Sequence, residues 1–138
     1  MIAYVDSSVL LRVVLGQTGR LKEWKKLTLG VASGLVEVEC LRALDRLRLE
    51  HGLADDQLAS RREAVYRMVV ELELIEPTSI VLRRAAQPLP TPLGTLDAVH
   101  LATASLWREL KGQDLFMATH DRALATAARA TGLRVLGM

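Results

Sequence analysis

The fold of this chain is indicated first by its opening residues, Met1-Ile2-Ala3-Tyr4-Val5-Asp6-Ser7-Ser8-Val9-Leu10-Leu11. A short, continuously apolar run such as residues 2–5 predicts a strand that is buried on both faces, as the strands of parallel sheets are. Ser7 or Ser8 can cap the helix that the following apolar residues predict. Asp6 is therefore expected at the end of a strand and just before a helix.

The same alternation of strand and helix continues along the chain. Further strands are expected at 29–32, 115–118 and 133–136, while 72–75 forms either a strand or the end of a helix. Helices are expected in the basic segment 21–27, from Ser33 up to Gly52, from Asp55 or Asp56 onward, from Leu96 to about Leu110, and from Asp121 onward. This alternation predicts a single α/β domain over residues 1–138 with a mainly parallel sheet.

The composition limits the kind of protein. The 138 residues are 50% hydrophobic and 25% charged, which is ordinary globular composition. Aromatic residues make up only 4%, so stacking on rings is not expected as the main mode of nucleic-acid binding. Cys40 is the single cysteine, which excludes an internal disulfide and favours a reducing compartment. We find no signal-peptide pattern and no membrane-spanning apolar stretch, so we expect a cytoplasmic protein.

The net charge is only +2, but the basic residues are clustered. One cluster comprises Arg20, Lys22, Lys25 and Lys26, and a second comprises Arg42, Arg46 and Arg48. Either cluster can be a solvated helix face or a surface that steers a nucleic-acid backbone toward a site. We hypothesise the steering role for Arg42 and for the stretch from Arg20 to Lys26.

Four acids occupy positions that polarity alone does not explain: Asp6, Glu39, Asp97 and Asp121. Each has a structural explanation when taken alone, because an acid in a first helical turn caps the helix and Glu39 can pair with an arginine. Ligands of parallel α/β domains bind beyond the carboxyl ends of the strands, where Asp6 and Asp121 are expected. Clustered carboxylates repel one another without a cation, and Mg²⁺ or Mn²⁺ prefers oxygen ligands. We therefore expect a divalent metal site of this type, since the scattered histidines indicate no zinc site.

Four segments resemble, in order, the motifs of the PIN domain family, and together they span nearly the whole chain. They are Tyr4-Val5-Asp6-Ser7-Ser8-Val9-Leu10-Leu11, Ala32-Ser33-Gly34-Leu35 with Glu39-Cys40-Leu41-Arg42-Ala43-Leu44, Thr95-Leu96-Asp97-Ala98-Val99-His100-Leu101-Ala102-Thr103-Ala104, and Ala118-Thr119-His120-Asp121-Arg122-Ala123-Leu124. The resemblance implies a three-layer α/β/α domain whose four acids bind Mg²⁺ or Mn²⁺ and cleave RNA. Ser8 and Thr119 match polar positions beside those acids, where they would hydrogen-bond a carboxylate or a bound water.

A stand-alone domain of this length is similar to the VapC toxins of bacterial and archaeal toxin–antitoxin pairs. That similarity implies a homodimer, and a VapB-type antitoxin that inserts a segment into the active-site groove. Glu39 fits the family's Glu-x-x-Arg pattern, whereas Glu37 cannot face the same way on a helix, so Glu39 is assigned to the site. The implied reaction is metal-assisted hydrolysis of an RNA phosphodiester by a water that attacks in line.

Several other side chains are assigned structural positions. His100 follows Asp97 by three residues on nearly the same helix face, but no acid–base partner is evident, so we expect a packed, structural histidine. His120 is expected to face solvent or RNA. Buried packing, with a dimer contact as the alternative for the tryptophans, is expected for Cys40, Trp24 and Trp107.

Rival classes were weighed on the same residues. A haloacid-dehalogenase-type phosphatase needs a second Asp where this chain has Ser8, and a response-regulator receiver needs adjacent acids after its first strand. The remaining alternative is a non-catalytic RNA-binding or scaffold module on the same fold. The set of four acids argues against that module, because clustered negative charge that faces phosphate weakens binding.

Overall fold

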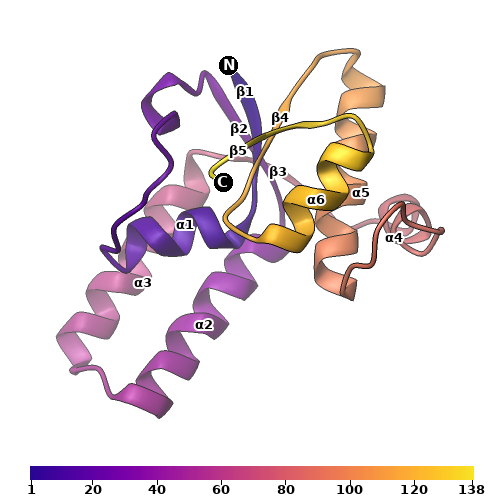
Figure 1. Cartoon of the computed structure of the whole chain (residues 1–138). Coiled ribbons are helices and arrows are strands. Elements are labelled where there is room, and N and C mark those ends of the chain that lie inside the picture. Colours follow the sequence, from indigo (N-terminus) through magenta and orange to yellow (C-terminus); the bar gives the residue numbers. More distant parts are fainter.

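Five parallel strands form the centre of the computed structural model, which describes residues 1–138 (Figure 1). The strands are β1 (Ile2–Val5), β2 (Leu29–Ser33), β3 (Glu73–Ile75), β4 (Phe116–Ala118) and β5 (Arg134–Leu136). The helices are α1 (Ser7–Val14), the 3-10 turn η1 (Trp24–Lys26), α2 (Leu35–His51), α3 (Asp55–Val70), α4 (Ser79–Ala85), α5 (Thr95–Lys111) and α6 (Arg122–Ala130). The sheet is parallel throughout, where the sequence predicted a mainly parallel one.

The strand order β3-β2-β1-β4-β5 places the first strand in the middle of the sheet. The chain builds outward from β1 to β2 and β3 on one side, and then returns to add β4 and β5 on the other side. In open α/β sheets, ligands bind where the strand order reverses, beyond the carboxyl ends of the strands. That point lies here at the ends of β1 and β4, where Val5 is in register with Ala118.

Helices cover both faces of the sheet, which gives the three layers expected from the resemblance (Figure 1). Successive residues of β1 alternate between the two faces, so that Val5 packs with α1, α2 and α3 while Tyr4 packs with α5 and α6. A strand buried on both faces needs apolar residues at every position, which accounts for its continuous apolar run. The core is mainly aliphatic.

Three local expectations were incomplete. The basic segment 21–27 forms a loop with the short turn η1 and not a longer helix. The segment 72–75, left open between two states, contains the edge strand β3. Helix α4 was not predicted, because it has only seven residues and packs on α5 mainly through Val81. No helix of the structure is both long enough and apolar enough to cross a membrane.

The long helix α2 projects with α3 as a hairpin from the body of the domain (Figure 1). Its buried stripe is Val36, Cys40 and Leu44, spaced four residues apart, and this confirms buried packing for Cys40. Leu49 near the end of α2 is 70% exposed. The helix ends at Gly52, whose φ of +71° is a conformation that glycine adopts more readily than other residues.

The two leucines of α2 provide a matched test of this packing. Leu44 is fully buried, so Leu44→Ala should lower the free energy of unfolding by about 2–5 kcal/mol. Leu49→Ala on the same helix should change it by no more than about 0.5 kcal/mol. Urea unfolding monitored by circular dichroism measures both values, and equal losses in the two variants would contradict the packing of α2.

Candidate active site

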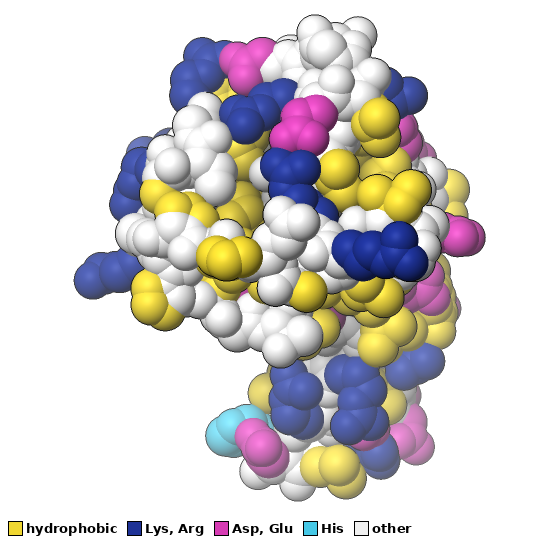
Figure 2. Space-filling model, turned by 90° about the vertical axis from the view of Figure 1, so that its right-hand side faces the viewer, with side chains coloured by type: hydrophobic (Ala, Val, Ile, Leu, Met, Phe, Trp, Pro, Cys, Tyr) yellow, Lys and Arg dark blue, Asp and Glu magenta, His cyan; other side chains and the backbone are white.

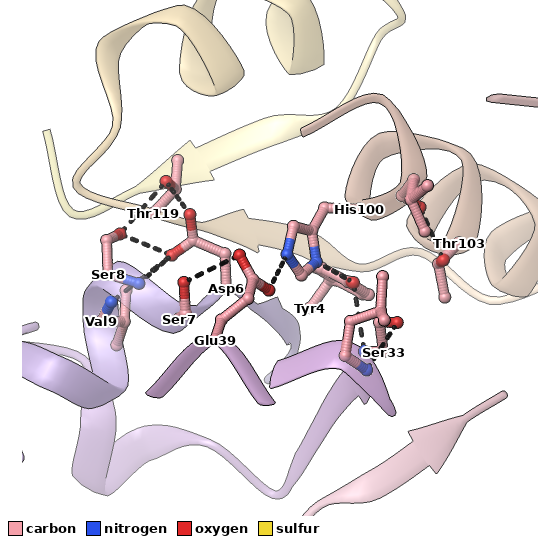
Figure 3. Close-up of polar contacts among 12 residues, drawn as sticks. Tyr4, Asp6, Ser7, Ser8, Val9, Ser33, Glu39, His100, Thr103 and Thr119 are labelled. Atoms are coloured by element: carbon pink, nitrogen blue, oxygen red, sulfur yellow. Dashed lines mark hydrogen bonds and ion pairs between the residues drawn. The ribbon is translucent and has the colours of Figure 1, made fainter. Parts of the chain in front are cut away.

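Asp6 lies at the end of β1, where it caps α1 and is only 3% exposed (Figure 3). Its Oδ1 accepts hydrogen bonds from the backbone N–H of Ser8 at 3.0 Å, from the Ser8 hydroxyl at 2.5 Å and from the N–H of Val9 at 3.4 Å. Its Oδ2 accepts one from the Thr119 hydroxyl at 2.7 Å. Asp6 is therefore the helix cap that we had expected from Ser7 or Ser8.

Ser8 and Thr119 each hold two parts of the site together. The Ser8 hydroxyl donates to Asp6 and accepts the backbone N–H of His120 at 2.9 Å. The Thr119 hydroxyl also donates to Asp6 and accepts the backbone N–H of Asp121 at 2.9 Å. The two hydroxyls thereby join the turn after β1 to the turn after β4, and both lie beside an acid as the sequence predicted.

Glu39 lies on α2 and faces the same region through two polar contacts (Figure 3). The Ser7 hydroxyl donates to its Oε2 at 3.3 Å, and His100 Nε2 lies 2.5 Å from its Oε1. His100 Nδ1 in turn lies 2.6 Å from the hydroxyl of Tyr4. The side chain of His100 is packed in the core as expected, but our reading that it lacks an acidic partner was wrong. The partner was not evident because 61 residues separate the two in sequence.

Asp97 and Asp121 complete the set of acids from the beginnings of two helices. Asp97 lies in the first turn of α5 and is partly buried. Asp121 caps α6, with its Oδ1 accepting the backbone N–H of Leu124 at 2.9 Å. Helix N-termini favour negative charge, so both carboxylates are stabilised locally. The capping role proposed for Asp121 alone is thus real and does not remove it from the site.

The pKa of Asp97 responds to the charges of the other three acids. Burial raises the pKa of Asp97, and the charge of Asp121, with smaller contributions from Asp6 and Glu39, raises it further against the opposing effect of His100. Burial also raises the pKa of Asp6, although the hydroxyls of Ser8 and Thr119 partly offset this. A carboxylate whose pKa is raised by neighbouring carboxylates lies in a region where a cation is favoured.

The donor set fits a hard divalent cation held partly through water. All four side chains offer carboxylate oxygens, and Asp6 Oδ2 accepts only one hydrogen bond and so keeps a free lone pair. No three His, Cys, Asp or Glu side chains are positioned to ligate one ion together. Mg²⁺ commonly keeps several waters and uses one or two carboxylates, so the arrangement suits Mg²⁺ or Mn²⁺ better than a metal that needs a closed cage.

A groove of about 320 Å³ lies between α1 and α2, and Glu39 is part of its lining. Arg42 and Arg46 line it together with the apolar side chains of Val38 and Leu96. Figure 2 shows the α2–α3 hairpin below the body of the domain, with Lys and Arg side chains on its surface. Of the predicted basic residues, Arg42 therefore lies in the same groove as Glu39, together with its helix neighbour Arg46.

The stretch containing Arg20, Lys22, Lys25 and Lys26 is not brought to the acids. It leads through η1 to the amino end of β2, where Thr28 donates its backbone N–H to the carbonyl of Met1. The acids lie beyond the opposite, carboxyl ends of β1 and β4. All four basic side chains are exposed, so the structure favours the alternative of a solvated surface for this cluster.

One histidine and the two tryptophans differ in how they are buried and in what they contact. His120 does not simply face solvent, because its Nδ1 donates to the carbonyl of Gly137 at 2.7 Å and its Nε2 is buried without a partner. Trp107 is in the core, and its indole N–H donates to Glu73 at 3.1 Å. Trp24 is partly buried against the core on the α1–α3 side.

Comparison with known proteins identifies the family. The PIN domain family matches residues 3–130. Ribonuclease VapC46 of Mycobacterium tuberculosis is 36% identical over 107 residues, which cover 77% of this chain and 72% of that protein.

Solved structures share the fold at low sequence identity. PAE2754 of Pyrobaculum aerophilum has a TM-score of 0.63 at 22% identity, covering 97% of this chain and 83% of that one. VapBC2 of Rickettsia felis, bound to a DNA fragment from its promoter, has a TM-score of 0.67 at 11% identity, covering 98% and 97%. The match over most of the chain, and the relative at 36% identity, settle the classification. The chain belongs to the PIN domain family.

Proposed function

We propose that this protein is a Mg²⁺- or Mn²⁺-dependent endoribonuclease that acts as the toxin of a VapBC-type toxin–antitoxin pair. The observation that carries the proposal is the gathering of Asp6, Glu39, Asp97 and Asp121 at the carboxyl edge of the sheet. Those are the four acids that the family motifs select. The relative that is named a ribonuclease supports RNA as the substrate.

In this proposal the acids hold the metal ion and basic residues bind the RNA. Asp6 is fixed by Ser8 and Thr119, and Asp97 and Asp121 are placed by the first turns of α5 and α6. These acids would hold the ion, directly or through water. When bound, the ion would supply positive charge to the phosphoryl oxygens and make a water more acidic. Guanidinium groups on α2 would bind the RNA backbone through its phosphates.

The alternative, a module that binds RNA without cleaving it, predicts a different charge at this surface. A protein that only bound RNA would gain from basic side chains throughout its binding surface, whereas here Glu39 lies in the groove that Arg42 and Arg46 line. We propose in addition that the protein forms a homodimer and is inhibited by a VapB-type antitoxin. Support for the antitoxin comes from the structural neighbour solved as VapBC2.

The variant Asp6→Asn should abolish RNA cleavage and leave the fold intact. Asparagine keeps the oxygen that caps α1, but it removes the charge that would hold a cation. Because burial raises the pKa of Asp6, the folded state favours a neutral side chain, and the melting temperature should be unchanged or higher. The assay measures cleavage of total cellular RNA by purified protein free of antitoxin. It is run with Mn²⁺ and, as a control, with EDTA.

Asp56→Asn is the matched control for that experiment. Asp56 is an exposed acid in the first turn of α3, away from the sheet edge, so its variant should cleave like the wild type. Discrete fragments that require both metal and Asp6 would establish the nuclease. Full activity in Asp6→Asn would remove Asp6 from the site, and a folded wild type that cleaves nothing with any metal would favour the binding module.

Divalent cations should stabilise the fold in a manner that depends on pH. The raised pKa values of Asp6 and Asp97 mean that the folded state favours their protonated forms, so stability is lost as pH rises through the folded pKa values. A cation offsets that loss only when the acids are ionised. At about ten times its dissociation constant, Mn²⁺ should add about 1.4 kcal/mol, or roughly 4 °C, at pH 7.5.

The same melting experiment includes its own controls. At about pH 5, where protons compete for the carboxylates, the increase from Mn²⁺ should be smaller. Asp97→Asn should reduce the increase at pH 7.5, whereas Asp56→Asn should preserve it. An increase that is equal at both pH values and in both variants would mean that the cation binds elsewhere.

A further inference from the structure

We propose that His100, oriented by Tyr4, is a positioning residue that fixes the carboxylate of Glu39 and leaves Oε2 as its less engaged oxygen for the metal site. This inference rests on the proposed function, since it concerns how one acid of that site is held. It gives a role at the site to a histidine that the sequence alone placed only in the core. The chain of contacts is visible in Figure 3.

The first part of the argument is a continuous row of hydrogen bonds through the core. The backbone N–H of Ser33, at the end of β2, donates to the hydroxyl of Tyr4 at 3.1 Å. That hydroxyl lies 2.6 Å from His100 Nδ1, and His100 Nε2 lies 2.5 Å from Glu39 Oε1. Tyr4, Ser33 and His100 are fully buried. The row therefore connects the backbone of the sheet to an acid on a different element.

The second part is the direction of the hydrogen bonds. An ionised carboxylate only accepts, so the His100 Nε2 that faces Glu39 must carry a proton. The Tyr4 oxygen already accepts from Ser33, which leaves its own O–H free to donate to Nδ1 of a neutral imidazole. A charged imidazole also donates from Nε2. The bond to Glu39 is thus the same in either state of His100.

The third part is what remains free on Glu39. Its Oε1 is occupied by a buried donor, while Oε2 meets only the Ser7 hydroxyl at the longer distance of 3.3 Å. The Glu39 side chain is 18% exposed, so that it still reaches the groove beside Arg42. A glutamate held in this way is already ordered, so it loses little further rotational freedom when it binds an ion. Partners of this kind orient the ligands of metal sites.

A purely structural histidine would only fill space in the core, whereas a positioning residue would donate a hydrogen bond to Glu39. Two substitutions distinguish these roles. The amide nitrogen of Gln can reach the position of His Nε2, whereas that of Asn reaches the position of Nδ1. His100→Gln should therefore keep a donor to Glu39, and His100→Asn should keep only a partner for Tyr4. Both variants replace the ring by an amide, and melting temperatures will show how far each perturbs the fold.

The measurements are Mn²⁺ affinity by titration calorimetry and the kcat and KM of RNA cleavage. For His100→Asn we expect a loss of about 10–100-fold in Mn²⁺ affinity and in kcat, with an unchanged KM for RNA. His100→Gln should retain most of both. Tyr4→Phe, which keeps the ring and loses only the hydroxyl, should fall between them, and it serves if His100→Asn does not fold.

Each alternative outcome contradicts the proposal in a recognisable way. Equal losses in the Gln and Asn variants would mean that His100 only fills space, and full retention in both would mean that Glu39 needs no partner. A wild type that binds no Mn²⁺ would also overturn it. Failure of the proposed function is a separate result, seen as Mn²⁺ binding that depends on Glu39 and His100 without any RNA cleavage.

Discussion

The structure depends on keeping the carboxylate of Asp6 buried at the end of the central strand. A buried charge is costly unless donors surround it, and here the donors come from two turns of the chain. Ser8 belongs to the turn after β1 and Thr119 to the turn after β4, and each also accepts a backbone N–H of the second turn. The point where the strand order reverses is therefore closed around one acid, and the other acids are placed relative to it.

The cost of this arrangement is electrostatic. Burial raises the pKa of Asp6 and of Asp97, and repulsion from the other acids raises the pKa of Asp97 further, so the ionised site works against the folded state. Asp97 and Asp121 recover part of the cost because each lies at a helix N-terminus, and Glu39 does so through its contact with His100. A bound cation would offset the electrostatic cost that remains. The same clustered charges therefore lower stability without a cation and would bind the cation that the proposed activity needs.

Local features of the sequence predicted the alternating strands and helices, and the resemblance to the PIN domain family added the three layers and the four acids proposed for the site. An apolar run that ends in Asp6, and an acid at the beginning of two helices, are patterns visible within a few residues. Contacts between distant segments were not predictable in this way. The pairing of His100 with Glu39 depends on how α5 packs beside α2. The position of the basic stretch near Lys25, at the edge of the sheet opposite to the acids, depends on the direction of β2. Helix α4 escaped prediction because seven residues carry too little periodicity.

The central claim is that these acids form one cation site at the carboxyl edge of the sheet. Crystals grown with Mn²⁺ and measured near its absorption edge test this directly, because anomalous scattering locates the ion without reference to activity. We predict an anomalous peak between Asp6, Asp97 and Asp121, with Glu39 directed toward it, and no such peak in crystals of Asp6→Asn. A peak elsewhere on the protein, or none at a saturating Mn²⁺ concentration, would contradict the account.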